Sequence, residues 1–122
     1  MKPKTAKRLA WPWETKNYFV LVAGEYEIHD KETAAYCLGW HDATPCPSVE
    51  EMLERMPYRI EIPEGYFYLE IEKYCHSYAV GYFHETEKER TSASFEEKDN
   101  LSEAVALLSI WLRDNNLMGW KP

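Results

Sequence analysis

The period of the apolar residues changes at residue 58, and this change limits the folds open to the chain. Before it, residues 49–56 place apolar side chains at the i, i+3, i+4 and i+7 spacing of a helix. After it, apolar and polar residues alternate as in β-strands, through 58–62, 66–74, 77–84 and 90–97. Four consecutive strands joined by short turns predict a four-stranded antiparallel meander.

Amphipathic helices are predicted on both sides of these strands. Ser48 and Glu51 have the spacing of a capping box at the start of the first helix. Asn100 begins the strongest helical pattern of the chain, which Asn115 and Asn116 end. Because the apolar side of a helix must be buried against another element, we expect both helices on one face of the meander.

A β–α unit precedes this arrangement. Residues 17–23 form a β-branched and aromatic run that predicts a buried strand, and 25–29 alternate as a partly exposed strand would. Asp30 is a good N-cap for a helix over 31–38, and Gly39 follows where glycine commonly ends helices. The predicted fold class is therefore α+β: a four-stranded antiparallel meander with two amphipathic helices on one face, preceded by a β–α unit.

The chain is long enough for one hydrophobic core, since 45% of its 122 residues are hydrophobic. Residues 1–10 lack apolar periodicity and contain four basic and no acidic side chains, so we expect a flexible basic arm there. The basic residues are Lys2, Lys4, Lys7 and Arg8. Residues 11–122 are then expected to form a single α+β domain.

Charge and hydropathy exclude several partners. The net charge is −7, from 14 Lys+Arg and 21 Asp+Glu, which argues against direct binding of DNA or RNA because phosphate contacts need a positive surface. The longest apolar run, 18–23, is far shorter than the roughly 20 residues of a membrane-spanning helix. No apolar segment of a signal peptide follows the basic N-terminus, and three cysteines cannot all pair within the chain. We expect a cytoplasmic protein with reduced thiols.

The predicted strands separate two sets of side chains. The more apolar set is assigned to the core beneath the helices and comprises Ile60, Ile62, Phe67, Leu69, Ile71, Ala79, Gly81, Phe83, Ala93 and Phe95. The other set alternates with it and comprises Glu61, Tyr66, Tyr68, Glu70, Glu72, Tyr78, Val80, Tyr82 and His84. Tyrosine rings give rigid contact area and carboxylates set polarity, so the second set predicts a protein-binding surface.

Partner binding is assigned to seven residues of this second set: Glu61, Tyr66, Tyr68, Glu70, Glu72, Tyr78 and Tyr82. Carboxylates at strand spacing present the charge that a basic groove attracts, so the expected partner is a basic or nucleic-acid-binding protein. The tyrosines also fit a purely structural interpretation, in which they fill cross-strand positions or lie under the segment of Trp11 and Trp13. Single-stranded nucleic-acid platforms place Lys and Arg beside the rings, whereas the neighbours here are Glu.

Cysteine and histidine residues provide the ligand types of a zinc site. Cys37, His41 and Cys46 lie close together in the sequence, and Cys75 and His76 form a separate pair. Their spacing matches no standard zinc module, so free thiols are the favoured interpretation. We expect no metal site.

A catalytic centre is not indicated either. A Cys–His pair, or the carboxylates Glu85, Glu87 and Glu89 near His84, would supply nucleophile or acid–base groups, but nothing in the sequence fixes their geometry. The run that ends at Arg90 alternates in charge and is typical of a solvated turn. The five glycines are scattered, so no phosphate-binding loop is predicted. We expect no catalytic residue and no cofactor.

Several features together resemble a known family. They are Gly39-Trp40 and Thr44-Pro45 in a loop, Pro47-Ser48 leading into a helix, paired tyrosine-rich strands, and an alanine- and leucine-rich closing helix from Asn100. Over residues 38–116 this pattern resembles the small phage-encoded "ABA sandwich" proteins. The resemblance implies a phage or prophage origin and no activity, since that family has no catalytic residues to carry over.

The expected function is a non-catalytic, acidic protein-binding module. A phage accessory protein of this kind would inhibit a host nucleic-acid-handling defence complex by occupying its basic surface. The main alternative is a self-associating structural protein, in which Trp40, Trp120 and the tyrosine-bearing face form a symmetric homodimer interface. A thiol- or metal-dependent enzyme is the least favoured alternative.

Overall fold

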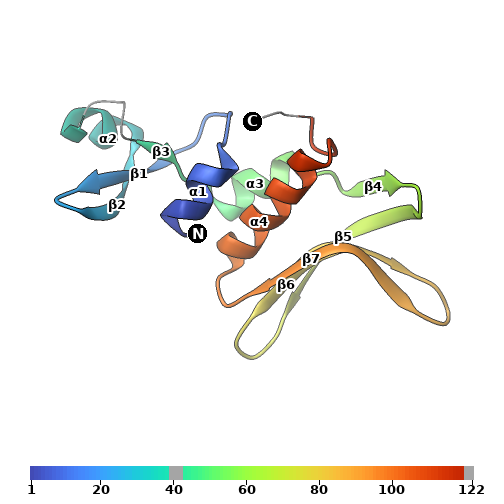
Figure 1. Ribbon diagram of the computed structural model, residues 1–122. Coiled ribbons are helices and arrows are strands. Elements are labelled where there is room, and N and C mark those ends of the chain that lie inside the picture. Colours follow the sequence, from blue (N-terminus) through green and yellow to red (C-terminus); the bar gives the residue numbers. More distant parts are fainter. Residues whose placement is uncertain (39–42, 120–122) are drawn as a thin grey trace.

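The computed structural model describes residues 1–38 and 43–119, and in this part of the chain it is an α+β protein with two antiparallel sheets (Figure 1). The α+β class and the antiparallel sheets are thereby confirmed. In chain order the elements are α1 (Pro3–Leu9), β1 (Asn17–Val22), β2 (Glu25–Asp30), α2 (Lys31–Leu38), β3 (Thr44–Pro45), α3 (Val49–Arg55), β4 (Arg59–Ile62), β5 (Gly65–Lys73), β6 (Tyr78–Glu85), β7 (Arg90–Lys98) and α4 (Leu101–Asp114).

Three helices begin at the capping residues that the sequence predicted. Ser48 and Glu51 make the reciprocal bonds of a capping box: the Ser48 hydroxyl accepts from the Glu51 amide, and the Glu51 carboxylate accepts from the Ser48 amide. The side chains of Asp30 and Asn100 accept bonds of 2.7 and 3.1 Å from the third amide of α2 and α4. These local signals therefore decide where the helices start.

The two sheets differ in size and composition. The larger has the strand order β4-β5-β6-β7, and every neighbouring pair is antiparallel. The smaller has the order β2-β1-β3, because the short strand β3 pairs with the other edge of β1. The sequence predicted a single β–α unit in this region and gave no indication of β3.

The main core lies between the four-stranded sheet and the helices above it (Figure 1). The helix α4 packs on β6 and β7, and both α1 and α3 pack on α4. Val105, Leu108 and Leu112 of α4 are completely buried there. The helix arrangement is thus more elaborate than two helices on a meander, since α1 joins this layer and α2 packs on the other sheet.

Residues 1–10, where we expected a flexible arm, form α1 and contribute to the core. Ala6 packs against β1, and Leu9 is fully buried in the main core. The Arg113 guanidinium of α4 donates through Nη1 to the carbonyls of Arg8 and Leu9, at 2.9 and 2.6 Å. These bonds satisfy carbonyls that the end of α1 leaves open. A seven-residue helix holds too few apolar residues to show a period in the sequence.

Candidate functional site

The register of the four-stranded sheet decides which side chains share a face, because residues paired across antiparallel strands point the same way. Leu69 pairs with Tyr82 and Ile71 with Val80, and α4 packs on the β6 and β7 part of this side, here called the helix face, while Ile71 at its margin is exposed. The opposite side, here called the open face, carries Arg59, Glu61, Tyr66, Tyr68, Glu70, Glu72, Ala79, Gly81, Phe83, Glu85, Arg90, Ser92, Phe95 and Glu97.

The structure reverses the face that the sequence assigned to β6. Val80 and Tyr82 are completely buried on the helix face, whereas Ala79, Gly81 and Phe83 belong to the open face. The hairpin is closed by the pair Lys73–Tyr78, and this register places every β6 residue relative to β5. The sequence alone does not show which face of β6 is buried, because β6 carries apolar residues on both faces.

A β-bulge explains why Ala93 and Phe95 do not share a face as expected. The register of β6 and β7 shifts between Tyr82 and Phe83, so that Ala93 has no partner of its own. Ala93 packs against the main core, while Phe95 pairs with Gly81 and is exposed on the open face. The bulge thus turns an aromatic ring away from the core.

Two of the seven residues assigned to partner binding lie on the helix face. The Tyr82 ring is buried, its hydroxyl donates to the Pro57 carbonyl oxygen at 2.6 Å, and burial raises the pKa of this phenol. Tyr78 pairs with Lys73 and Lys98 on the same side of the sheet. Tyr82 is therefore a core residue.

The other five residues, Glu61, Tyr66, Tyr68, Glu70 and Glu72, come together on the open face as expected. Tyr66 is 44% exposed and Tyr68 is 37% exposed. All five lie on β4 and β5, where the alternation in the sequence is clean. The sequence therefore identified the part of the open face on β4 and β5 and missed the part that β6 and β7 supply.

Arg90 of β7 lies among the carboxylates of the open face. Its Nη2 is 2.5 Å from Glu70 Oε2 and 2.6 Å from Glu72 Oε1, and its Nε is 3.4 Å from Glu85 Oε1. The Tyr74 hydroxyl donates to Glu72, and this bond and the contact with Arg90 hold the pKa of Glu72 below its ordinary value. Glu70 and Glu72 are therefore already paired within the molecule, which the sequence did not indicate.

Aromatic rings flank this ion-pair network. Tyr58 and Tyr68 meet edge to face with ring centroids 5.6 Å apart. The Arg90 guanidinium carbon lies 3.9 Å from the centroid of the Phe83 ring, and Phe83 contacts Phe95. Arg90 therefore contacts both the carboxylates and the Phe83 ring on the open face.

Gly81 has a structural role in this aromatic cluster. A Cβ built on Gly81 would lie 2.5 Å from Phe95 Cβ and 2.7 Å from the Ser94 carbonyl oxygen. Any side chain at this position would have to displace both Phe95 and the backbone of β7. The glycine therefore lets Phe95 cross the strand on the open face.

A hollow lies where four residues of the open face, Tyr68, Glu70, Phe83 and Glu85, meet Tyr58 and the chain at Leu69 and His84. The hollow of about 450 Å³ is lined by Tyr58, Tyr68, Leu69, Glu70, Phe83, His84 and Glu85. Its walls combine two tyrosine rings with two carboxylates. Glu85 is its most exposed carboxylate and is held to Arg90 only by the longest contact of the network. The hollow is suited to an organic cation such as a lysine or arginine side chain.

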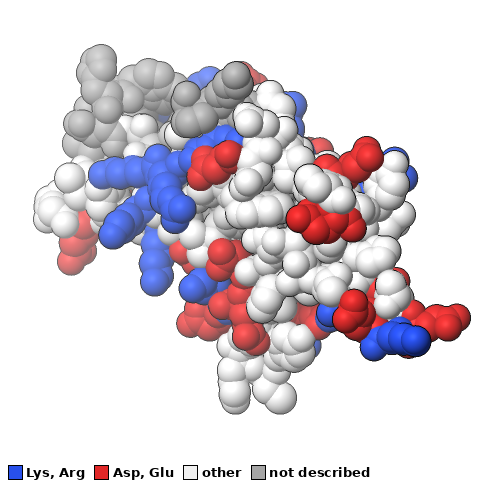
Figure 2. Space-filling model, turned by 45° about the vertical axis from the view of Figure 1, so that its right-hand side comes forward, with Lys and Arg blue, Asp and Glu red and all other residues white. Residues whose placement is uncertain are grey.

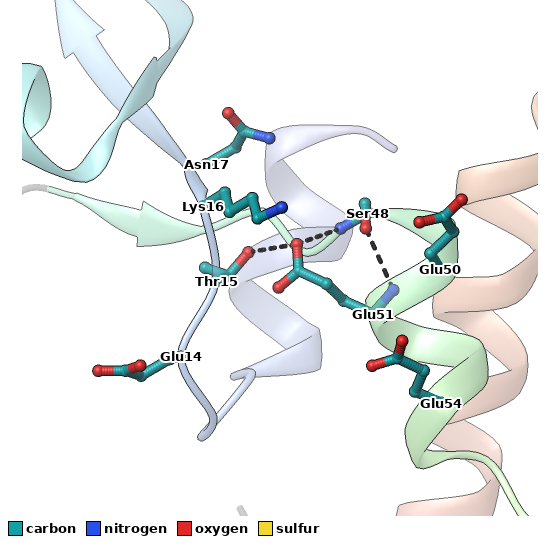
Figure 3. Close-up of a pocket in the computed structure, with 8 residues that line it drawn as sticks. All are labelled: Glu14, Thr15, Lys16, Asn17, Ser48, Glu50, Glu51 and Glu54. Atoms are coloured by element: carbon teal, nitrogen blue, oxygen red, sulfur yellow. Dashed lines mark hydrogen bonds between the residues drawn. The ribbon is translucent and has the colours of Figure 1, made fainter.

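A second hollow lies between residues 14–17 and the start of α3 (Figure 3). It measures about 530 Å³ and includes the carboxylates of Glu14, Glu50, Glu51 and Glu54. The Glu51 carboxylate already accepts bonds from Thr15 and from the Ser48 amide. The carboxylates do not converge on one point in Figure 3, so the arrangement does not resemble a metal site.

Charged side chains are unevenly distributed over the surface (Figure 2). Lys and Arg side chains gather on the left of that view, on the side of α1, whose exposed residues include Lys4, Lys7 and Arg8. Acidic side chains are more numerous over the lower and right-hand parts. On the open face five glutamates stand against two arginines, so this face is net negative.

The remaining sequence candidates do not form a site in the described residues. His41 and Trp40, and also Trp120, lie outside them, as does the side chain of Cys37. Burial raises the pKa of the Cys46 thiol, which favours the unreactive form, and Cys75 is exposed in the turn between β5 and β6. No group of three His, Cys, Asp or Glu side chains that could hold a metal is found among the described residues.

The turn after His84 is closed by its own bonds. The Thr86 amide donates to the Glu89 carbonyl oxygen at 2.9 Å, and the Thr86 hydroxyl accepts from the Glu89 amide. The His84 Nδ1 atom lies 3.1 Å from the Tyr66 carbonyl oxygen, towards β5 and away from the turn. Of the carboxylates near His84 in the sequence, Glu85 lines the same hollow as His84.

Comparison with known proteins adds no assignment. No family model matches the chain, and no curated protein and no solved structure matches it significantly. None of the helices in residues 1–38 and 43–119 is long and apolar enough to cross a membrane.

Proposed function

We propose that the chain is a non-catalytic protein-binding module whose open face binds a basic segment of a partner protein. The observation that carries this proposal is the hollow between Tyr58, Tyr68, Glu70 and Glu85. Aromatic rings beside carboxylates attract a cation through the ring faces and through charge together. The net negative charge of the open face would also steer a basic partner towards it.

Not every carboxylate of the open face contributes equally to such binding. Glu70 and Glu72 pair with Arg90, so their charge is largely compensated within the molecule. Glu85 has only the 3.4 Å contact with Arg90, and its side chain is largely exposed. Glu85 and Tyr68 are therefore the residues on which we expect the affinity for a basic side chain to depend most.

The partner that we propose is a nucleic-acid-handling defence complex. Such a complex has a basic groove, and a net negative, aromatic sheet face is complementary to such a surface. The chain is then a phage accessory protein that acts as an inhibitor by occupying that groove. Direct binding of DNA or RNA is not part of the proposal, because phosphates would be repelled by the open face.

The proposal is tested by titration with a synthetic peptide of lysine, arginine and glycine. The wild-type protein should bind it with an affinity that falls as the salt concentration rises. The double variant Tyr68→Ala/Glu85→Gln should bind at least about tenfold more weakly, since it loses one ring and one charge of the hollow. Fluorescence anisotropy of the labelled peptide gives both affinities.

The matched control is Glu54→Gln, which removes the same charge from the hollow beside α3. It should leave the affinity unchanged within about twofold, because the two hollows are on different elements. If Glu54→Gln weakened binding as much as the double variant did, only net charge would matter and the open face would not be the binding site. No binding by the wild type would also contradict the proposal.

A further inference from the structure

We infer that the free edge of β2 pairs with β2 of a second copy of this chain. The pairing would be antiparallel about a two-fold axis at Ile28, and it would join two three-stranded sheets into one continuous sheet. This surface belongs to the sheet that does not carry the open face, so the inference stands independently of the proposed function.

The backbone of β2 offers unpaired hydrogen-bonding groups on its outer side. β2 is the outermost strand of the order β2-β1-β3, and no strand of the described residues pairs with its other edge. The turn that joins it to β1 has two residues, Ala23 and Gly24, both with positive φ, as in a type I′ turn. Such a turn is closed by a hydrogen-bonded pair, and hydrogen-bonded pairs then alternate along the ladder. The backbone N–H and C=O groups of Tyr26, Ile28 and Asp30 therefore point away from β1.

Side chains beside this edge are apolar and exposed. Ile28 is 57%, Leu21 42% and Tyr26 39% exposed, and all three lie on the face of the sheet against which α1 packs. The helix α2 packs on the opposite face, through Ala34 against Tyr18 and Val20 of the sheet. The Lys7 side chain of α1 reaches Tyr26, whereas Ile28 farther along the strand is the most exposed of the three. The unpaired N–H and C=O groups of an open edge are a template for pairing with another strand.

The side chains of β2 are complementary to those of a second β2 in one register. With the axis at Ile28, the two Ile28 residues face each other, and Glu27 lies opposite His29 of the second copy. Within one chain His29 Nε2 is already 3.0 Å from Glu27 Oε1, so both groups are oriented for such contacts. Directly opposite side chains that carry opposite charges stabilise an antiparallel pair, as Glu27 and a protonated His29 would.

The neighbouring registers are unfavourable. An axis at His29 would leave only residues 28–30 paired, because α2 begins at Lys31. An axis at Glu27 would place two Glu27 carboxylates opposite each other, and an axis at Tyr26 would place Glu25 opposite Glu27. Like charges directly opposite destabilise a strand pair. In the register with its axis at Ile28, β2 is complementary to itself. For this reason we assign a second copy of this chain to the edge, and not a strand of another protein.

The register is tested by cross-linking in a Cys37→Ser/Cys75→Ser background, in which Cys46, buried in the structure, is the remaining native thiol. We expect a disulfide-linked dimer when Glu27→Cys protein and His29→Cys protein are mixed and oxidised gently. Each variant alone should give no more dimer than the background protein. Cross-linking of Glu27→Cys alone, or no cross-link in the mixture, would overturn the assigned register.

The association itself is tested by sedimentation equilibrium of the full chain. The wild type should dimerise, and Ile28→Lys should be a monomer because it places two charges at the two-fold axis. Ile71→Lys is the matched control, since Ile71 is an exposed isoleucine on the other sheet, and it should still dimerise. Circular dichroism checks that both variants fold. A monomeric wild type, or a dimer that Ile28→Lys does not dissociate, would overturn the inference.

Discussion

The two sheets of this molecule bury their side chains in different ways. The four-stranded sheet buries one face against a single large core that includes residues of α1, α3 and α4. The three-stranded sheet buries only part of each face, in two small clusters: Phe19 with Ala6 and Cys46 on one side, and Tyr18 with Val20 and Ala34 on the other. Stability should therefore be concentrated in the larger sheet.

The surfaces that the two sheets leave exposed differ accordingly. The open face of the larger sheet is polar and aromatic, and its charges are organised around Arg90. The smaller sheet leaves aliphatic side chains, Ile28 above all, beside the outer edge of β2, with which no strand of the described residues pairs. The first pattern is typical of a surface that meets a charged partner, and the second of a surface that continues a sheet. The helix α1 connects the two sheets. Its Leu9 belongs to the main core beneath the larger sheet, and its Ala6 packs against Phe19 of the smaller one.

The largest expected effect is that of Tyr82, which the structure moves from the surface to the main core. Tyr82→Ala should destabilise the protein by about 3–5 kcal/mol, as expected for a large buried aromatic residue. Tyr66→Ala, on the open face, should cost less than about 1 kcal/mol. Urea denaturation measures both. Equal costs for the two tyrosines would contradict the register described here.

The next prediction compares the same substitution in the two sheets. Val80 and Val20 are both completely buried valines, and each lies in an inner strand of its sheet. Val80→Ala leaves a cavity in the large core and should cost about 2 kcal/mol, whereas the small cluster around Val20 can relax and Val20→Ala should cost about 1 kcal/mol. Thermal or urea unfolding gives the difference. A larger cost at Val20 would show that the three-stranded sheet holds more of the stability than its size indicates.

The smallest expected effect concerns Glu72 and acid. Because Tyr74 and Arg90 lower the pKa of Glu72 below the ordinary 4.5, its carboxylate stabilises the folded state above that pH, and the contribution is lost as the pH falls. The difference in Tm between wild type and Glu72→Gln should therefore shrink between about pH 6 and about pH 3. Glu64→Gln, in the turn before β5, is the control with the same loss of charge. A difference that stays constant with pH would show that the ion pair contributes nothing.

The predicted elements agree closely with the structure where local signals are strong. The capping residues Asp30, Ser48 and Asn100 fix the starts of three helices, since their bonds are made within one turn. The faces of β4 and β5 also follow from the sequence. Polar and apolar residues alternate along β5 from Tyr66 to Glu72, with the tyrosines counted as polar. These properties depend on neighbours along the chain.

The candidate site was predictable only in part. Glu61, Tyr66 and Tyr68 could be placed from alternation alone, but Arg90 could not be placed beside Glu70, because they are paired through two separate hairpins. The signal available in the sequence was the length of each turn, which fixes the register of the following strand. Alternation alone does not give the register of β6, and the predicted face of Tyr82 is therefore wrong.

By itself, then, the sequence determined the α+β class, the starts of the helices and the two-sided character of β5. Only the tertiary structure decided that α1 is part of the core, that β6 turns Tyr82 inward and that a bulge turns Phe95 outward. The physical reason is the range of the interactions. Caps and alternation are set within a few residues, whereas burial in a core and strand register depend on contacts between residues far apart in the chain, such as Arg113 with Leu9.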